Sequence, residues 1–220
     1  EIGLGIPAEP LFRSAVLAQP RCEKKEGGVI WEAQGSGKSL IMVWLAEWIH
    51  ENIDNSRVVI ITDREELDEQ ISDGFKDTGE TIARAKSGAG LIGMLNEEAP
   101  WLLCTLIHKF GKKNVEGKGD MAGVKSEIPL EKYLEEIVAQ LPQGFKAKGN
   151  IFVFIDECHR TQGGYLHEAM KTIMGKDVMM IGFTGTPLLH AQKKDTWQTF
   201  GPLIHAYRFN EAVEDGVILD

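Results

Sequence analysis

The sequence predicts an α/β domain with a central, mostly parallel β-sheet flanked by helices. Five short apolar runs are continuous rather than alternating, which is typical of strands covered by helices on both faces. The segments between these runs carry apolar residues at spacings of three and four, so strand and helix alternate along the chain. A glycine-rich turn also lies between the first apolar run and the first helical segment, which gives the order strand, turn, helix that is typical of such domains.

The elements follow from these patterns in order along the chain. The expected strands lie at residues 28–31, 57–62, 101–105, 151–156 and 178–184. The expected helices lie at residues 38–52, 64–72, 129–140 and 164–173. Residues 111–127 are rich in Gly and Lys, so we expect a long surface loop there, either a disordered insertion or a segment that faces nucleic acid. We see no domain boundary and expect residues 1–220 to form a single domain.

Composition restricts the function classes. The net charge of −9 argues against a broad basic surface that grips nucleic acid, so any such contact must come from a few local loops. No run of about 18 apolar residues and no secretory signal pattern is visible, so we expect a cytoplasmic protein with no membrane partner. Cys22, Cys104 and Cys158 lack a C-x-x-C spacing, which indicates reduced thiols rather than disulfides or a zinc site.

The first chemical motif is the segment GVIWEAQGSGKSL. Gly35 and Gly37 let the backbone wrap a polyphosphate, Lys38 supplies a cation near the β and γ phosphates, and Ser39 offers its hydroxyl to Mg²⁺. The consensus G-x-x-x-x-G-K-[ST] is not fully met, because Glu32 occupies its first glycine position. A turn that merely connects two elements is the alternative. The expected nucleotide-binding residues are Gln34, Gly35, Ser36, Gly37, Lys38 and Ser39.

The second motif is IFVFIDECHR, an apolar strand that ends in two adjacent carboxylates. Carboxylates are costly to bury without a metal or a charged partner. In P-loop NTPases an Asp at this place holds Mg²⁺ and a following Glu polarises the attacking water, so we assign these roles to Asp156 and Glu157. A solvated turn would be the interpretation if the glycine-rich loop were absent.

The third motif is MMIGFTGTPL, in which an apolar strand leads into small hydroxyl and turn residues. Thr184 and Thr186 could hydrogen-bond the acidic pair and move with it. A capped turn after a strand is the simpler alternative.

Together these segments resemble motifs I, II and III of superfamily 2 helicases and translocases, and more specifically the restriction (R) subunit of type I restriction-modification enzymes. The match rests on WEAQGSGKSL, ITDREELDEQI, LLCTLIHKF, DECHRTQGG and GFTGTPL, and continues through FGPLIHAYRFNEAVEDG. The resemblance implies a RecA-like P-loop NTPase domain, the first lobe of an ATP-driven DNA translocase motor that uses ATP and Mg²⁺.

The resemblance also implies partners and further site residues. The partners are double-stranded DNA, a second RecA-like lobe and a nuclease domain of the same full-length chain, and separate specificity and methyltransferase subunits. By motif matching, the residues placed against the DNA backbone are Thr62, Arg64, Thr105 and Lys109. Solvated surface charge is the alternative for Arg64 and Lys109. The residues expected to couple the ATP site to the opposing lobe are His159, Arg160, Thr184 and Thr186.

Some features depart from this family pattern. Glu32 stands at the first Walker position, and Cys158 replaces the small Ala of related motifs. Neither a nuclease motif nor a second lobe with its arginines is visible, so we expect a fragment that hydrolyses ATP only weakly by itself.

Three other functions remain open. Another superfamily 2 machine, such as an RNA helicase or a remodeller, would be favoured if RNA rather than DNA stimulated ATP turnover. A nucleotide-sensing or partner-binding module that no longer hydrolyses ATP is less consistent with the intact set of Lys38, Ser39, Asp156 and Glu157. A P-loop metabolic kinase would leave DECHR and GFTGTP without a role.

Overall fold

The structure is a computed structural model, and it describes residues 27–62, 75, 79–85, 88–106, 139, 141–158, 163–186 and 199–218. The strands are β1 (Gly28–Glu32), β2 (Ser56–Thr62), β3 (Ala83–Ala85), β4 (Leu102–Leu106), β5 (Asn150–Ile155), β6 (Met179–Thr184) and β7 (Leu203–Tyr207). The helices are α2 (Lys38–Asn52), α4 (Gly88–Asn96), α6 (Gly163–Met174) and α8 (Phe209–Glu214).

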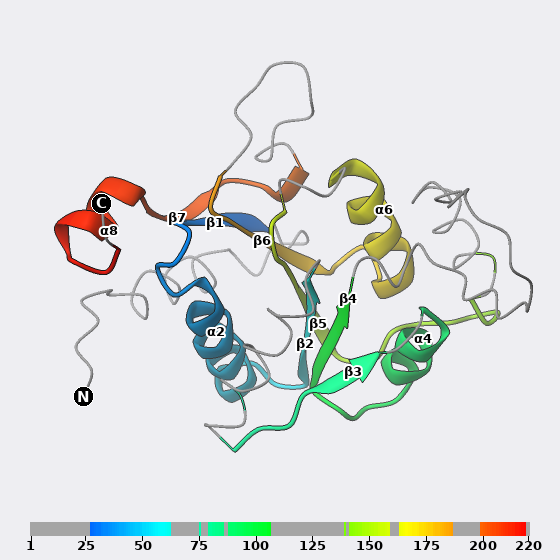
Figure 1. The fold of residues 1–220 in the computed structure, drawn as a ribbon. Coiled ribbons are helices and arrows are strands. Elements are labelled where there is room, and N and C mark those ends of the chain that lie inside the picture. The colour runs from blue at the N-terminus through cyan, green and yellow to red at the C-terminus, as the bar shows by residue number, and fades with distance from the viewer. Residues whose placement is uncertain are drawn as a thin grey trace, which may run out of the picture.

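Within this part of the chain, seven strands form one sheet in the order β3-β4-β2-β5-β6-β1-β7, and every pairing is parallel. Because parallel strands end at the same edge of a sheet, the segments that follow β1, β6 and β5 emerge side by side (Figure 1). The predicted α/β fold with a parallel sheet is therefore confirmed, and "mostly parallel" becomes fully parallel among these strands.

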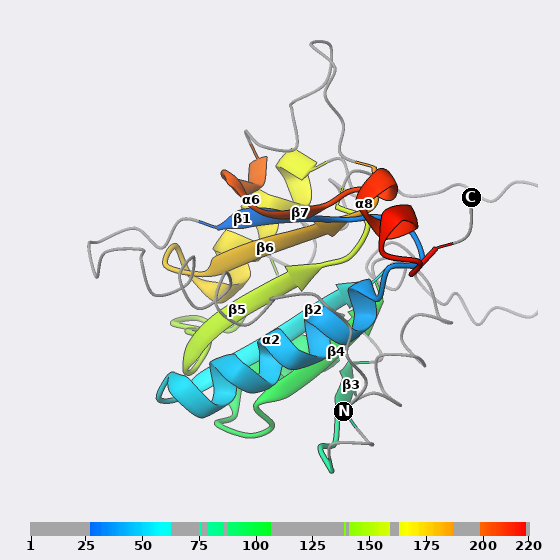
Figure 2. The same cartoon turned by 90° about the vertical axis from the view of Figure 1, so that its left-hand side faces the viewer.

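Helices cover both faces of the sheet, with α2 on one side and α4 and α6 on the other (Figures 1 and 2). Alternate residues of each strand point to opposite faces, so β2 sends Val58 and Ile60 toward α2 and Val59 and Ile61 toward the other side. Two separate hydrophobic clusters result, one on each face. This double burial explains why the strands read as continuous apolar runs.

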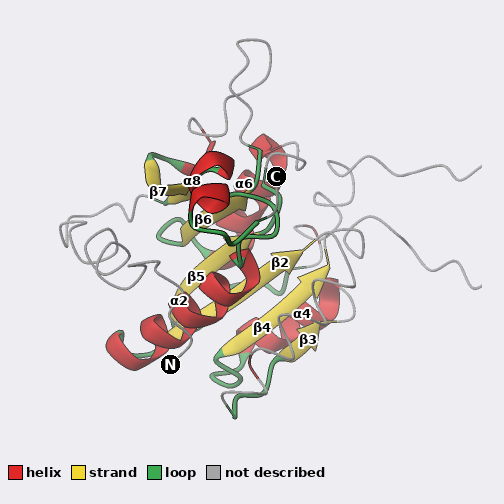
Figure 3. Ribbon diagram, turned by 60° about the vertical axis from the view of Figure 1, so that its left-hand side comes forward, coloured by secondary structure: helices red, strands yellow, loops and turns green. Residues whose placement is uncertain are grey.

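The predicted strands are confirmed, with ends that differ from the prediction by one residue at most. Helix α2 spans the predicted residues 38–52, and α6 extends the predicted 164–173 by one residue at each end. The structure adds β3, α4, β7 and α8, which the sequence patterns did not indicate (Figure 3). The predicted helix at 64–72, the loop at 111–127 and all of the helix at 129–140 except Ala139 lie outside the described residues.

Candidate functional site

The loop between β1 and α2 has the shape expected of a phosphate-binding turn. Gly35 and Gly37 adopt φ angles of 87° and 98°, a region that side-chain-bearing residues rarely adopt. Gly37 is also the N-cap of α2, so no side chain caps the helix, and no acidic residue lies in its first turn. The positive end of the helix dipole therefore points into the loop without a competing carboxylate. Gln34 and Gly35 are exposed, whereas Ser36 is buried beneath them.

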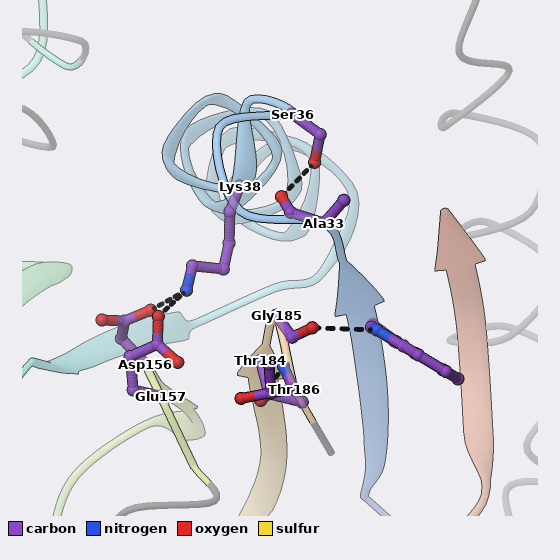
Figure 4. A network of polar contacts seen from close by, with 9 residues as sticks. Ala33, Ser36, Lys38, Asp156, Glu157, Thr184, Gly185 and Thr186 are labelled. Carbon is purple, nitrogen blue, oxygen red and sulfur yellow. Dashed lines mark hydrogen bonds and ion pairs between the residues drawn. The ribbon is translucent and has the colours of Figure 1, made fainter. Parts of the chain in front are cut away.

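Lys38, the first residue of α2, reaches from this loop to the end of β5 (Figure 4). Its Nζ lies 2.9 Å from Asp156 Oδ1 and 2.6 Å from Glu157 Oε1, although more than a hundred residues separate the lysine from the two carboxylates in sequence. The structure therefore brings together the lysine and both carboxylates that the sequence assigns to one site.

The backbone that carries the two carboxylates is held between neighbouring strands. The Asp156 N–H donates to the Ile61 carbonyl of β2, and the Cys158 N–H donates to the Phe183 carbonyl of β6. Between these anchors Glu157 has a φ of 45°, which is uncommon for a residue other than glycine and tends to occur at functional sites. The turn keeps the Asp156 side chain 1% exposed while the Glu157 side chain is 18% exposed.

Charge interactions stabilise the contact of Lys38 with Asp156 and Glu157. Burial alone would lower the pKa of Lys38, but Asp156 and Glu157 outweigh it and raise that pKa above its usual value. Burial raises the pKa of Asp156, and the nearby Lys38 ammonium opposes this shift. Asp156 Oδ2 is buried and has no hydrogen-bond partner among the described residues. An orphaned carboxylate oxygen of this kind can accept a hard cation.

A magnesium ion fits the donor set around Asp156. Oxygen ligands from one or two side chains, completed by phosphate and water, are what Mg²⁺ uses in nucleotide sites. The described residues contain no group of three or more His, Cys, Asp or Glu side chains that could hold a metal ion by themselves. Ser39 lies at the start of α2, next to Lys38, and is partly buried.

The third motif follows β6, which lies between β1 and β5 in the sheet. Thr184 is fully buried, and its Oγ1 accepts a hydrogen bond from the Thr186 N–H at 3.1 Å, which is the capped turn that the sequence offered as the simpler alternative. The hydrogen bond from these threonines to the acidic pair stays a prediction. The Gly185 carbonyl accepts a hydrogen bond from Trp31 Nε1 of β1 at 3.1 Å.

The predicted DNA-contact and coupling residues are less fully described. Thr62 ends β2 and Thr105 lies near the end of β4, and their side chains are buried rather than solvent-facing. This burial lends no support to a DNA contact, which stays a prediction for both. Four further predicted residues lie outside the described residues: Arg64, Lys109, His159 and Arg160.

Sequence reasoning missed the surroundings of Glu32. Its carboxyl is fully buried at the end of β1, with Oε2 3.2 Å from Ser36 Oγ and Oε1 3.3 Å from His205 Nε2 of β7. Burial raises the pKa of Glu32 to about 7. The available signal was a carboxylate at the end of an apolar run, in a position where the loop consensus has glycine.

The fold and this geometry define a RecA-like P-loop NTPase domain. The chain belongs to the SWI2/SNF2 ATPase family, whose model matches residues 12–220. Nucleotide binding is thus a property of its family.

Curated relatives confirm the resemblance to type I restriction enzymes. The chain is 29% identical over 214 residues to the type I restriction enzyme SauCOLORF180P endonuclease subunit of Staphylococcus aureus, covering 95% of this chain and 21% of that protein. It is also 29% identical over 207 residues to the HindI endonuclease subunit of Haemophilus influenzae, covering 86% of this chain and 17% of that one. The chain thus spans about a fifth of the length of these relatives.

Solved structures agree on the fold. The helicase domain of Hef from Pyrococcus furiosus matches with a TM-score of 0.58 and 16% identity, over 91% of this chain and 37% of that one. The SWI2/SNF2 ATPase core of Sulfolobus solfataricus, solved with double-stranded DNA, matches with a TM-score of 0.52 and 12% identity, over 88% and 33% of the two chains. None of the helices in the described part of the chain is long and apolar enough to cross a membrane.

Proposed function

We propose that this chain is the ATP-binding and ATP-hydrolysing lobe of a DNA translocase motor, within the R subunit of a type I restriction enzyme. The observation that carries the proposal is the contact of Lys38 Nζ with Asp156 and Glu157 across the ends of α2 and β5. A lysine from a glycine-rich loop and two carboxylates from a nearby strand end are the parts that P-loop NTPases use for phosphoryl transfer.

The loop residues would bind the polyphosphate. The backbone of residues 34–37 can wrap the phosphates because both glycines hold the positive φ angles that a tight phosphate-binding turn needs, and the start of α2 contributes its dipole. Lys38 carries the mobile cation. When phosphate is present, the Lys38 ammonium can turn from the two carboxylates toward the phosphate oxygens, because it pairs with either kind of anion.

Asp156 and Ser39 would hold Mg²⁺, which when bound neutralises charge on the phosphate oxygens. Asp156 suits this role because its side chain is almost fully buried and one of its oxygens lacks a partner among the described residues. Glu157 is better suited to water, because its side chain is more exposed than that of Asp156. There the carboxylate can accept a proton from the attacking water.

The motor and DNA-translocation parts of the proposal rest on the relatives. The chain resembles endonuclease subunits about five times its length, which leaves room in such a protein for a second RecA-like lobe and a nuclease domain. Double-stranded DNA, specificity subunits and methyltransferase subunits would be its further partners. With a net charge of −9, the lobe would contact DNA through local loops rather than a basic face.

A second candidate is another superfamily 2 motor, such as a remodeller. It is favoured by the SWI2/SNF2 family model, which spans nearly the whole chain. The two candidates share the nucleotide site and differ in the polymer that stimulates turnover and in the attached domains.

The test is steady-state ATP hydrolysis by the full-length protein, with double-stranded DNA, with RNA and without nucleic acid. We expect stimulation by double-stranded DNA. Glu157→Gln should keep ATP affinity but lose turnover, because it removes the base without removing a metal ligand, whereas Asp156→Ala should also weaken Mg²⁺-dependent binding. Glu98→Gln, an exposed carboxylate between α4 and β4, is the matched control and should retain full activity. Near-normal turnover in Glu157→Gln would refute the assigned role, and stimulation by RNA alone would favour the second candidate.

A further inference from the structure

Glu32 is buried directly beneath the phosphate loop, and β7 lies on its other side. None of its side chain is exposed, and the two carboxyl oxygens face different elements. Oε2 lies 3.2 Å from Ser36 Oγ in the loop, and Oε1 lies 3.3 Å from His205 Nε2. A charged carboxylate at such a site, next to a loop that receives polyphosphate, would be costly both in desolvation and in repulsion.

The number of available hydrogens indicates which form of Glu32 fits. Ser36 Oγ lies 2.7 Å from the Ala33 carbonyl, which can only accept, so the single hydroxyl hydrogen of Ser36 belongs to this shorter contact. The remaining contact, between Ser36 Oγ and Glu32 Oε2, then needs a hydrogen from Glu32. A protonated Glu32 supplies it, whereas Oε1, 3.3 Å from His205 Nε2, makes no hydrogen bond among the described residues. A charged Glu32 would leave two acceptors facing each other.

The electrostatic surroundings agree with this assignment. Burial raises the pKa of Glu32 most, the Ser36 contact and Lys38 lower it and Glu211 of α8 raises it, so that the resulting pKa is about 7. Burial lowers the pKa of His205, which keeps that imidazole neutral near pH 7. The Glu32 carboxylate also contributes to the raised pKa of Tyr207 in β7.

We propose that Glu32 is a positioning residue that, in its uncharged form, donates a hydrogen bond to Ser36 and holds the phosphate loop in its binding shape. The inference rests on the proposed function, because it assigns a purpose to the loop's shape. Its consequence is a nucleotide affinity that is highest while Glu32 is protonated and falls as the pH rises and Glu32 ionises.

The experiment measures Mg-ADP affinity by calorimetry in the full-length protein, from about pH 6 to about pH 8.5, in wild type, Glu32→Gln and Glu32→Ala. Glutamine keeps the shape, donates to Ser36 and cannot ionise. If bound phosphate raises the pKa of Glu32 by one unit, wild type should lose about tenfold more affinity across this range than Glu32→Gln. Glu32→Ala should bind more weakly at every pH, and Gln should restore the binding. Protonation of ADP itself affects all three proteins alike and cancels in the comparison.

Glu211→Gln is the matched control, because Glu211 is an exposed carboxylate that also acts on Glu32. It should keep a pH-dependent affinity, with the midpoint shifted slightly downward. The titration of the Glu32 carboxyl can also be followed without nucleotide by carbon-13 NMR. The Glu32 signal is identified as the one that is missing in Glu32→Gln, and its titration midpoint should lie near pH 7. A midpoint near the ordinary 4.5, equal pH dependence in wild type and Glu32→Gln, or undiminished binding in Glu32→Ala would each overturn the inference. Absence of nucleotide binding in wild type would instead refute the proposed function, and the carboxyl titration would still decide the protonation of Glu32.

Discussion

Arg57 offers a demanding test of how the described fold is held together at the end of the sheet opposite the candidate site. It lies in β2 and is only 2% exposed. Its guanidinium donates hydrogen bonds of 2.7 to 3.2 Å to backbone carbonyls from two stretches of chain, those of Met94, Leu95, Glu97 and Pro100 in the first and that of Lys148 in the second. Burial lowers the pKa of Arg57, and Glu97 raises it, but a guanidinium remains charged at neutral pH.

Replacement of Arg57 by Met keeps most of the side-chain volume and removes every donor. Each hydrogen bond to a charged group contributes about 1.5 to 3 kcal/mol, but the losses are not additive, because water can reach some of the carbonyls that are released. Breaking a buried network of this kind costs about 3 to 5 kcal/mol in the free energy of unfolding. For a chain of this size, that corresponds to a melting temperature lower by roughly 10 °C.

The assay is urea and thermal unfolding of residues 1–220, followed by circular dichroism. Lys176→Met is the control, because Lys176 is an exposed residue in the turn between α6 and β6 and its loss should change the free energy of unfolding by no more than about 0.5 kcal/mol. Arg57→Lys should fall between the two, since it retains the charge but presents all its donors from one atom. If Arg57→Met unfolds within about 0.5 kcal/mol of wild type, the carbonyl cluster does not depend on the guanidinium and the reasoning is wrong.

The candidate site supports two more expectations. Lys38→Ala should weaken Mg-ATP binding strongly, because it removes the cation that lies beside the loop, and undiminished affinity by calorimetry would contradict the assignment. The isolated chain should bind nucleotide yet turn it over slowly and fail to move along DNA, because charge stabilisation by an arginine from a second lobe is worth roughly 10³ to 10⁵ in rate in related systems. An ATPase assay on residues 1–220 decides this, and DNA-stimulated turnover of many per second would show that one lobe suffices.

The sequence predicts the sheet and the centre of the candidate site well, for a common reason. Strands covered on both faces must be apolar throughout, so β2, β5 and β6 stand out as uninterrupted runs. Lys38 and Asp156 can be paired from sequence because each follows or ends a strand of one parallel sheet, and such strand ends meet at the same edge. The local sequence patterns and the parallel sheet therefore predict the same location for the site.

Helix α4 could not be predicted, because its sequence GAGLIGMLN contains three glycines, each unfavourable in a helix by up to about 1 kcal/mol relative to alanine. Tertiary contacts form it instead. Leu91 and Leu95 are buried against the sheet. The buried Arg57 guanidinium donates hydrogen bonds to the carbonyls of Met94 and Leu95 at the end of the helix. Strand β7 was missed for a related reason, since it is a partly exposed edge strand with mixed side chains.

Gly185 approaches the phosphate loop closely, a contact that the sequence did not predict for the third motif. A Cβ at this position would lie 3.3 Å from the Glu32 carbonyl oxygen and 3.5 Å from the Gln34 backbone nitrogen. The Gly185 carbonyl in turn accepts a hydrogen bond from Trp31, whose ring lies under the Arg208 guanidinium, with 5.3 Å between Arg208 Cζ and the ring centroid. The turn after β6 therefore packs against the first residues of the loop, and Trp31 contacts both this turn and Arg208, which follows β7. Because packed backbones cannot slide past one another freely, a shift of the turn after β6 must be accompanied by a shift of the loop or of Trp31. The third motif thus contacts the glycine-rich loop through backbone packing, which does not require a hydrogen bond between its threonines and the acidic pair.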